Sequence, residues 1–226
     1  MFDGPFSHSI IKRALDKKIV EIDYRNIRDF GLGKQRMVDD TPYGGGAGML
    51  LRVDVLDKAI QASQCKKNSC KERVILLDAG GKTFTQQKAA LLANTYTHLI
   101  FICAHYEGVD DRIRTYIDEE ISIGDYVITG GELPAMLITD AIVRLLPGVL
   151  GKDISSLDES FQSTNEKSTG LLEYPQYTRP ALYKGSAVPD ILLSGHHKNI
   201  TKWRKDASKN RTEKNRPDLL TSKPKR

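Results

Sequence analysis

Two continuous apolar runs constrain the fold of this chain most strongly. Residues 74–78 read Val-Ile-Leu-Leu-Asp, and residues 98–103 read His-Leu-Ile-Phe-Ile-Cys. Runs without polar alternation are typical of strands that are buried on both faces, as in a parallel sheet. Segments with helical periodicity lie around them, at residues 53–62, 84–94 and 133–146. Because strands alternate with helices, the sequence predicts a parallel α/β domain that extends to about residue 150.

Shorter segments complete this domain. Residues 19–24 alternate apolar and polar side chains and predict a further strand, and residues 120–123 predict a short one. Residues 25–51 form a long glycine-rich loop. A loop of this length inside a compact domain is usually functional or disordered.

The composition changes after residue 150. Residues 152–169 are rich in Ser, Asp, Glu and Asn, and the chain from Gly170 onward is first punctuated by proline and then helical and basic. Polar, weakly apolar stretches are typical of linkers. We therefore predict a domain at 1–151, a flexible linker at 152–169 and a small, mostly helical domain at 170–226.

The positive charge is concentrated in one segment. The net charge is +5, whereas residues 196–216 alone hold eight Lys or Arg against two Asp or Glu, and Trp203 lies among them. A basic stretch is often only a solvated helix face. Here the aromatic side chain adds a stacking surface to the cations, which favours a nucleic-acid partner.

The cysteines and the lengths of the apolar runs indicate the cellular compartment of the protein. Cys65, Cys70 and Cys103 do not form a disulfide framework, so we expect free thiols in a reducing compartment. Cys65 and Cys70 have no His or Cys partner nearby in the sequence, so zinc spacing fails and no metal ligands are predicted. No apolar run reaches the ~18–20 residues of a membrane span, and no secretory signal is visible. We expect a cytoplasmic protein with no membrane partner.

Glycine-rich turns follow three apolar segments, at residues 78–81, 104–108 and 123–134. Ligands bind at the carboxyl ends of strands in open α/β sheets, and glycine permits a close backbone approach there. A nucleoside-triphosphate loop is not indicated, because the segment Gly81-Lys82-Thr83 has Leu76 where that motif needs glycine. The turns predict a small-molecule site without saying which molecule binds.

Seven motifs, in this order and spacing, closely resemble the bacterial tRNA (guanine-37 N1)-methyltransferases, and the resemblance covers essentially the whole chain. The motifs are PYGGGAGM at 42–49, YEGVD at 106–110, SIGDYV at 122–127, GGELPA at 130–135, PGVLG at 147–151, YTRP at 177–180 and LLSGHH at 192–197.

The resemblance implies a fold, a methyl donor and a substrate. The fold would be of the SPOUT class, a parallel α/β sheet with a C-terminal trefoil knot, plus the small helical domain. The enzyme would be a cytoplasmic homodimer that transfers a methyl group from S-adenosylmethionine to N1 of guanosine-37, next to the anticodon, and its C-terminal helices would bind the anticodon stem-loop. By motif position the donor pocket would contain Leu77, Ala104, Tyr106, Glu107, Ile123, Gly124, Asp125, Tyr126, Val127, Ile128, Gly130, Gly131 and Pro134. The basic residues expected to bind tRNA, with their aromatic neighbour, are Lys198, Lys202, Trp203, Arg204, Lys205, Lys209 and Arg211.

The resemblance also implies catalytic residues. N1 of guanine is protonated at neutral pH, so a carboxylate must remove its proton, and a guanidinium can stabilise the charge that develops on the base. Arg144 occupies the family's arginine position. The family's Asp before Ser-Phe aligns with Glu159, and Asp158 precedes it, so either carboxylate could be the base. Whether Mg²⁺ assists is left open.

The family opens with an apolar strand ahead of the position of Met1. We therefore expect this chain to lack that strand, and to fold poorly if it begins at Met1. Three other functions are kept as alternatives: a knotted RNA methyltransferase with another target base, a non-catalytic RNA-binding module, and a nucleotide-binding metabolic enzyme.

Overall fold

The structure is a computed structural model, and it describes residues 1–150, 159–161 and 170–221. The chain divides into two compact units, Met1–Gly151 and Lys152–Arg226. Each unit is described by itself. Within the described residues, no helix combines the length and the apolar character needed to cross a membrane.

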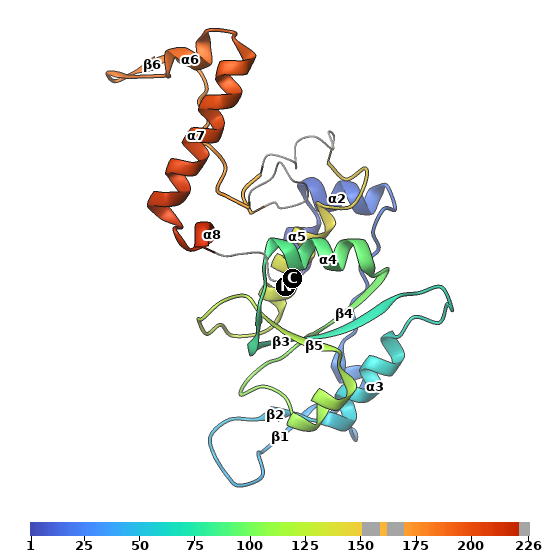
Figure 1. The fold of residues 1–226 in the computed structure, drawn as a ribbon. Helices are drawn as coiled ribbons and strands as arrows, with labels where there is room; N and C mark the ends of the chain where they lie inside the picture. Colours follow the sequence, from blue (N-terminus) through green and yellow to red (C-terminus); the bar gives the residue numbers. More distant parts are fainter. Residues whose placement is uncertain (151–158, 162–169, 222–226) are drawn as a thin grey trace. The chain divides into compact units, whose positions relative to one another are not determined.

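A parallel sheet forms the centre of the first unit. Its middle strand is β3 (Glu72–Thr83), with β4 (His98–Cys103) on one side and β5 (Glu119–Ser122) on the other (Figure 1). Ile75 of β3 lies opposite Phe101 of β4 and Glu119 of β5. The predicted α/β class and the parallel pairing of the two apolar runs are confirmed.

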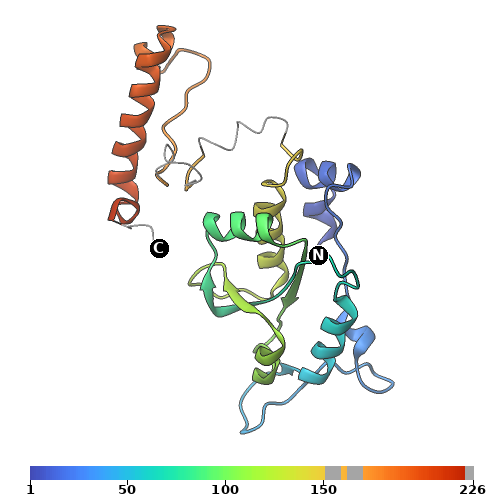
Figure 2. The ribbon, with the colours of Figure 1, turned by 45° about the vertical axis from the view of Figure 1, so that its right-hand side comes forward.

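Helices cover both faces of this sheet, as Figures 1 and 2 show. Side chains of β3 alternate between the faces because successive residues of a strand point in opposite directions. Val74 and Leu76 pack with α3 (Val53–Ser63) and the 3₁₀ helix η2 (Asp111–Tyr116). Ile75 and Leu77 pack with α4 (Gln86–Thr95) and α5 (Glu132–Val143). The sheet is therefore buried on both sides, which explains its lack of polar alternation.

The N-terminal helices α1 (Asp3–Phe6) and α2 (Ser9–Asp16) pack against α5, where Phe6, Ile11 and Ala14 join Met136 and Val143 in a third apolar cluster. The strand predicted at residues 19–24 is wrong. These residues have no strand partner among the described residues, and Ile19, Val20 and Ile22 instead pack against the same cluster. Alternating apolar residues indicate that one side of the segment is buried. A helix can cover that side as well as a neighbouring strand can.

The glycine-rich loop has a small framework of its own. It contains the 3₁₀ helix η1 (Ile27–Phe30) and an antiparallel pair, β1 (Asp39–Asp40) with β2 (Leu50–Leu51). The end of β2 is tied to the segment after β4, since Leu51 N donates to Gly108 O at 3.0 Å and Asp110 N donates to Leu51 O at 2.9 Å. The loop is thereby held beside the carboxyl end of β4.

Strand β3 continues past the predicted turn at residues 78–81. Ile121 of β5 lies opposite both Leu77 and Lys82, so the residues between them form an irregularity in the pairing. A Cβ at Gly81 would lie 2.6 Å from Ile121 N. Glycine is needed here for the close approach of two backbones rather than to reverse the chain.

The cysteine prediction is wrong for two of the three residues. Cys65 and Cys70 form a disulfide within the loop between α3 and β3, whereas Cys103 is free as predicted. The prediction of no metal ligands stays a prediction, but one ring nitrogen of His98 lies within 4.8 Å of both sulfur atoms. Sequence spacing missed His98 because strand pairing, not chain proximity, brings it there.

The second unit is built on a basic helix. Its elements are the hairpin β6 (Leu182–Tyr183) and β7 (Ser186–Ala187), followed by the helices α6 (Asp190–Leu193), α7 (His197–Asn215) and α8 (Asp218–Thr221). The backbone of Leu172 is hydrogen-bonded to two side chains of α7. Its N–H donates to Thr212 Oγ1 at 3.0 Å, and its carbonyl accepts from Ser208 Oγ at 2.6 Å. Thr212 is fully buried, although it lies in the most basic part of the sequence.

Candidate active site

A cleft of about 300 Å³ opens at the carboxyl ends of the parallel strands. It is lined by the end of β3, the loop after β4, the loop after β5 and the start of α5. All the residues predicted to hold the methyl donor line this cleft except Asp125. The structure therefore brings together residues from three separate stretches of the sequence, 77–79, 104–108 and 121–134. Its further lining residues, not in the predicted set, are Asp78, Ala79, His105, Gly108, Ile121, Ser122 and Thr129.

Gly131 fixes one wall of the cleft. Gly131 N donates to Ala104 O at 2.8 Å, and a Cβ at Gly131 would lie 2.5 Å from the Cα of Cys103 and 2.9 Å from Ala104 N. Backbone atoms have no room to yield to such a contact. The loop after β5 can therefore return against the end of β4 only because residue 131 has no side chain.

A tight turn forms the opposite part of the lining. Gly124 has φ of +140°, a conformation that favours glycine, and Tyr126 N donates to Gly124 O at 3.0 Å. Ser122 Oγ accepts from Gly124 N at 3.2 Å. Asp125 is exposed at the apex of this turn and does not line the cleft. The motif predicted that Asp125 would line the cleft, but the turn directs Asp125, between Gly124 and Tyr126, to solvent.

The glycine-rich loop reaches the rim of the cleft at Glu107. A Cβ at Gly48 would overlap Glu107 Cγ, and Glu107 N donates to Met49 O at 3.3 Å. Gly48 has φ of +84°, so both its conformation and its contact with Glu107 favour glycine. The first and second of the seven motifs are therefore packed against each other.

His105 and Glu132 form a polar pair beside the cleft, with His105 Nε2 and Glu132 Oε1 2.5 Å apart. Glu132 lies 27 positions from His105 in the sequence, so no local spacing predicts this pair. Burial raises the pKa of the neighbouring Cys103 thiol to about 12, and the charge of Glu132 adds to this shift. The Cys103 thiol is therefore neutral at physiological pH.

The predicted catalytic residues fall in different units. Arg144 is half-buried at the C-terminal end of α5 in the first unit. Glu159 is half-buried in the second unit, where its neighbour Ser160 accepts a hydrogen bond from Glu173 N at 2.9 Å. Asp158 lies outside the described residues. The roles of these three residues stay predictions.

The residues predicted to bind tRNA all lie on α7. The six cationic ones are exposed, and Trp203 is half-buried. Trp203 and Arg204 line a cleft of about 350 Å³ in the second unit, together with Tyr174 and Tyr177. The Arg204 guanidinium lies 4.8 Å from the centre of the Tyr174 ring. Helix α7 therefore offers exposed cations, and its Trp203 adds an aromatic ring to the cleft that Tyr174 and Tyr177 also line.

A cleft with glycine-rich walls at the carboxyl ends of parallel strands defines a ligand-binding α/β protein. The sequence also matches the family described as tRNA (Guanine-1)-methyltransferase TrmD, over residues 1–222. The chain belongs to this family.

Three relatives, each named tRNA (guanine-N(1)-)-methyltransferase, illustrate the similarity. The protein of Listeria welshimeri is 50% identical over 225 residues, which are 99% of this chain and 89% of the relative. That of Streptococcus thermophilus is 55% identical over 217 residues, 96% of this chain and 86% of the relative. That of Bacillus cereus is 52% identical over 221 residues, with 97% and 87% covered.

Proposed function

We propose that this protein transfers a methyl group from S-adenosylmethionine to N1 of guanosine-37 in tRNA. Membership of the TrmD family and the names of the relatives support methylation of a tRNA guanine at N1. The observation that carries the proposal is the cleft, where most of the expected donor pocket converges. The finer points, the donor and position 37, rest on the motifs.

The cleft has a size and lining that fit a nucleoside-bearing donor. Its walls include Leu77, Ile123 and Pro134, which offer apolar contact to an adenine ring, and its glycine segments expose backbone N–H and C=O groups. Glu107 would lie near the amino-acid end of the donor. When bound, S-adenosylmethionine supplies an electrophilic methyl group.

The protein's own residues would prepare the guanine for this transfer. A carboxylate, Glu159 or Asp158, would accept the N1 proton, because N1 is a poor nucleophile while it is protonated. Arg144 would hold O6 or a phosphate and stabilise negative charge on the base. The resemblance to the family supports the further proposal that the enzyme is a homodimer that binds tRNA, with each active site built from both subunits.

The chain path supports the proposed trefoil knot. Strand β5 lies on one side of β3, yet the segment that follows it pairs beside the end of β4 on the other side, through a bridge between His105 and Gly130. The cations of α7 support the proposed role of residues 170–226 in binding the anticodon stem-loop, with residues 152–169 as a linker. Electrostatic binding of this kind weakens steeply as salt rises.

The test is methyl transfer from labelled S-adenosylmethionine to two tRNA transcripts that carry guanine or adenine at position 37. We expect transfer only to the guanine transcript. Arg144→Ala should keep donor affinity and lose turnover by about a hundredfold or more, whereas the exposed Arg25→Ala should match the unaltered protein. Equal transfer to both transcripts would contradict the proposed position, and loss of donor binding in Arg144→Ala would contradict its assigned role.

A further inference from the structure

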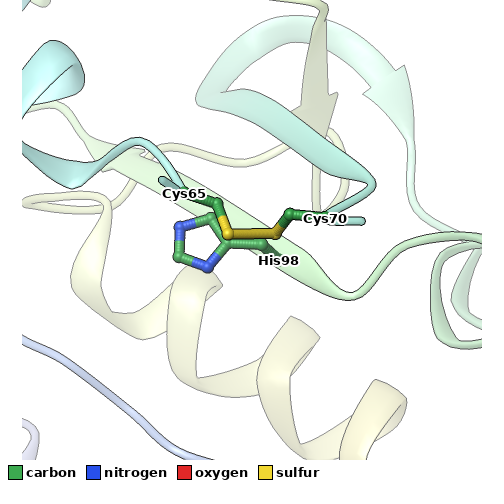
Figure 3. Close-up of side chains that lie close together, drawn as sticks. All are labelled: Cys65, Cys70 and His98. Atoms are coloured by element: carbon green, nitrogen blue, oxygen red, sulfur yellow. A yellow bond between two sulfur atoms is a disulfide. The ribbon is translucent and has the colours of Figure 1, made fainter. Parts of the chain in front are cut away.

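The loop between α3 and β3 places two sulfur atoms beside an imidazole. Cys65, Cys70 and His98 each offer a ligand atom, and these atoms all lie within 4.8 Å of one another (Figure 3). Of the part of the chain that the structure describes, this is the one group of three or more His, Cys, Asp or Glu side chains close enough to hold a metal ion. It lies at the amino ends of β3 and β4, opposite the cleft.

The backbone holds this group in place without the disulfide. His98 begins β4 and is paired in register with Glu72 of β3. Lys71 O accepts from Thr97 N at 2.9 Å and from His98 N at 3.2 Å, and Lys71 N donates to Thr97 Oγ1 at 3.0 Å. The end of the cysteine loop is therefore fixed to the start of β4 by strand pairing, which persists when the cysteines are reduced.

Neighbouring polar groups leave His98 ready to act as a ligand. His98 Nε2 lies 2.9 Å from Ser63 O, and a carbonyl oxygen can only accept, so Nε2 carries the proton in this contact. Nδ1 then keeps its lone pair. Metal-binding histidines commonly donate their other N–H to a backbone carbonyl in this way. Glu72 accepts from Cys65 N at 2.6 Å and so orients the first cysteine.

We propose that, when reduced, Cys65, Cys70 and His98 bind a zinc-class divalent ion, with solvent in the fourth position. Two thiolates and an imidazole are ligands that Zn²⁺ favours and Mg²⁺ does not. Around tetrahedral Zn²⁺ such atoms lie roughly 3.5–3.8 Å apart, given ~2.3 Å to sulfur and ~2.0 Å to nitrogen. To reach this spacing the S–S bond must open and the side chains, whose ligand atoms already lie within 4.8 Å of one another, must rotate.

The disulfide and the metal complex exclude each other. A dithiol reductant gives two electrons and two protons to the disulfide, which breaks the S–S bond, leaves two thiols and converts the reductant to its own disulfide. Zn²⁺ then forms two Zn–S bonds and one Zn–N bond, and the two thiol protons go to solvent. All three side chains are half-buried, so the reductant and the ion can reach them.

The test uses Co²⁺ as a spectroscopic probe of the full chain. The disulfide is first reduced with a phosphine, which takes oxygen from water and becomes a phosphine oxide. We expect one equivalent of Co²⁺ to bind with a thiolate-to-metal charge-transfer band, Zn²⁺ to displace it, and the oxidised protein to show neither. Cys65→Ser and Cys70→Ser should each weaken binding roughly a hundredfold, and His98→Gln by roughly tenfold or more. The matched control Cys103→Ala should keep the band.

A second measurement needs no variant. Zn²⁺ should slow alkylation of Cys65 and Cys70 in the reduced, unaltered protein by at least about tenfold, as followed by peptide mass spectrometry. Absence of the charge-transfer band, unchanged alkylation with Zn²⁺, or a band that depends on Cys103 would each overturn the proposal. None of these readouts involves methyl transfer, so the result is independent of the proposed activity.

Discussion

Gly131→Ala tests whether close backbone packing builds the candidate site. Gly131 has φ of −77° and ψ of −8°, which alanine adopts without strain, so the substitution isolates the added methyl group. That methyl would lie 2.5 Å from the Cα of Cys103, about 1 Å inside ordinary carbon contact. The loop after β5 must therefore move away from the end of β4.

The magnitude follows from the atoms that are contacted. Overpacking costs about 1–3 kcal/mol, and backbone neighbours place this site toward the upper end. Loss of glycine entropy in the unfolded chain returns about 0.4–1 kcal/mol. We expect a net loss of about 2 kcal/mol in the free energy of unfolding. Because Ala104 and Gly131 both line the cleft, a movement between them should weaken S-adenosylmethionine binding by at least about tenfold, equivalent to ~1.4 kcal/mol.

Urea unfolding and calorimetric titration with S-adenosylmethionine measure the two effects. Gly4→Ala is the control, because a Cβ at Gly4 meets no atom within 4 Å. It should change the free energy of unfolding by less than about 0.5 kcal/mol. The reasoning is refuted if Gly131→Ala is as stable as Gly4→Ala and binds the donor as the unaltered protein does.

Three further predictions concern stability. Thr212→Val leaves Leu172 N without its 3.0 Å acceptor, so urea unfolding should show a loss of about 1–3 kcal/mol, and an unchanged midpoint would contradict this. Glu119→Gln weakens the 3.1 Å contact with Arg73 Nε and should lower the free energy of unfolding by about 1–3 kcal/mol. If Glu119→Gln costs as much in an Arg73→Ala protein as in the unaltered one, the two side chains are not coupled. The pKa of Cys103 is raised by burial from 9.0 to about 12, so its contribution to stability is complete below pH 9 and is lost as pH rises toward 12. Between pH 9 and 11 the unaltered protein should lose roughly 2 kcal/mol more than Cys103→Ala, and equal losses would refute the shift.

Local patterns were enough to predict the central elements and the edge where the cleft lies. The runs at 74–78 and 98–103 are apolar on both faces, which only a doubly covered strand accommodates well. Glycine after such strands signals a close backbone approach, and the positions of these turns predicted most of the cleft. The run of cations in α7 is likewise visible without coordinates, because charge is a property of the residues themselves.

Patterns failed where a residue's role depends on what lies opposite it. Residues 19–24 alternate like a strand, yet the partner that covers their apolar side is a helical cluster. Gly81 resembled a turn residue, but the backbone of Ile121 is what requires it. Thr212 is fully buried, and its hydroxyl accepts a hydrogen bond from Leu172 N, 40 residues earlier in the chain.

The sequence by itself determined the class of fold, the family and the edge of the sheet that holds the cleft, because these depend on local hydrophobicity, glycine and motif order. Only the tertiary structure decided that His98 meets Cys65 and Cys70, that His105 meets Glu132, and that Asp125 faces solvent. Those contacts depend on strand register and on the geometry of single turns. Register is a cooperative property of the whole sheet, so no local window of sequence contains it.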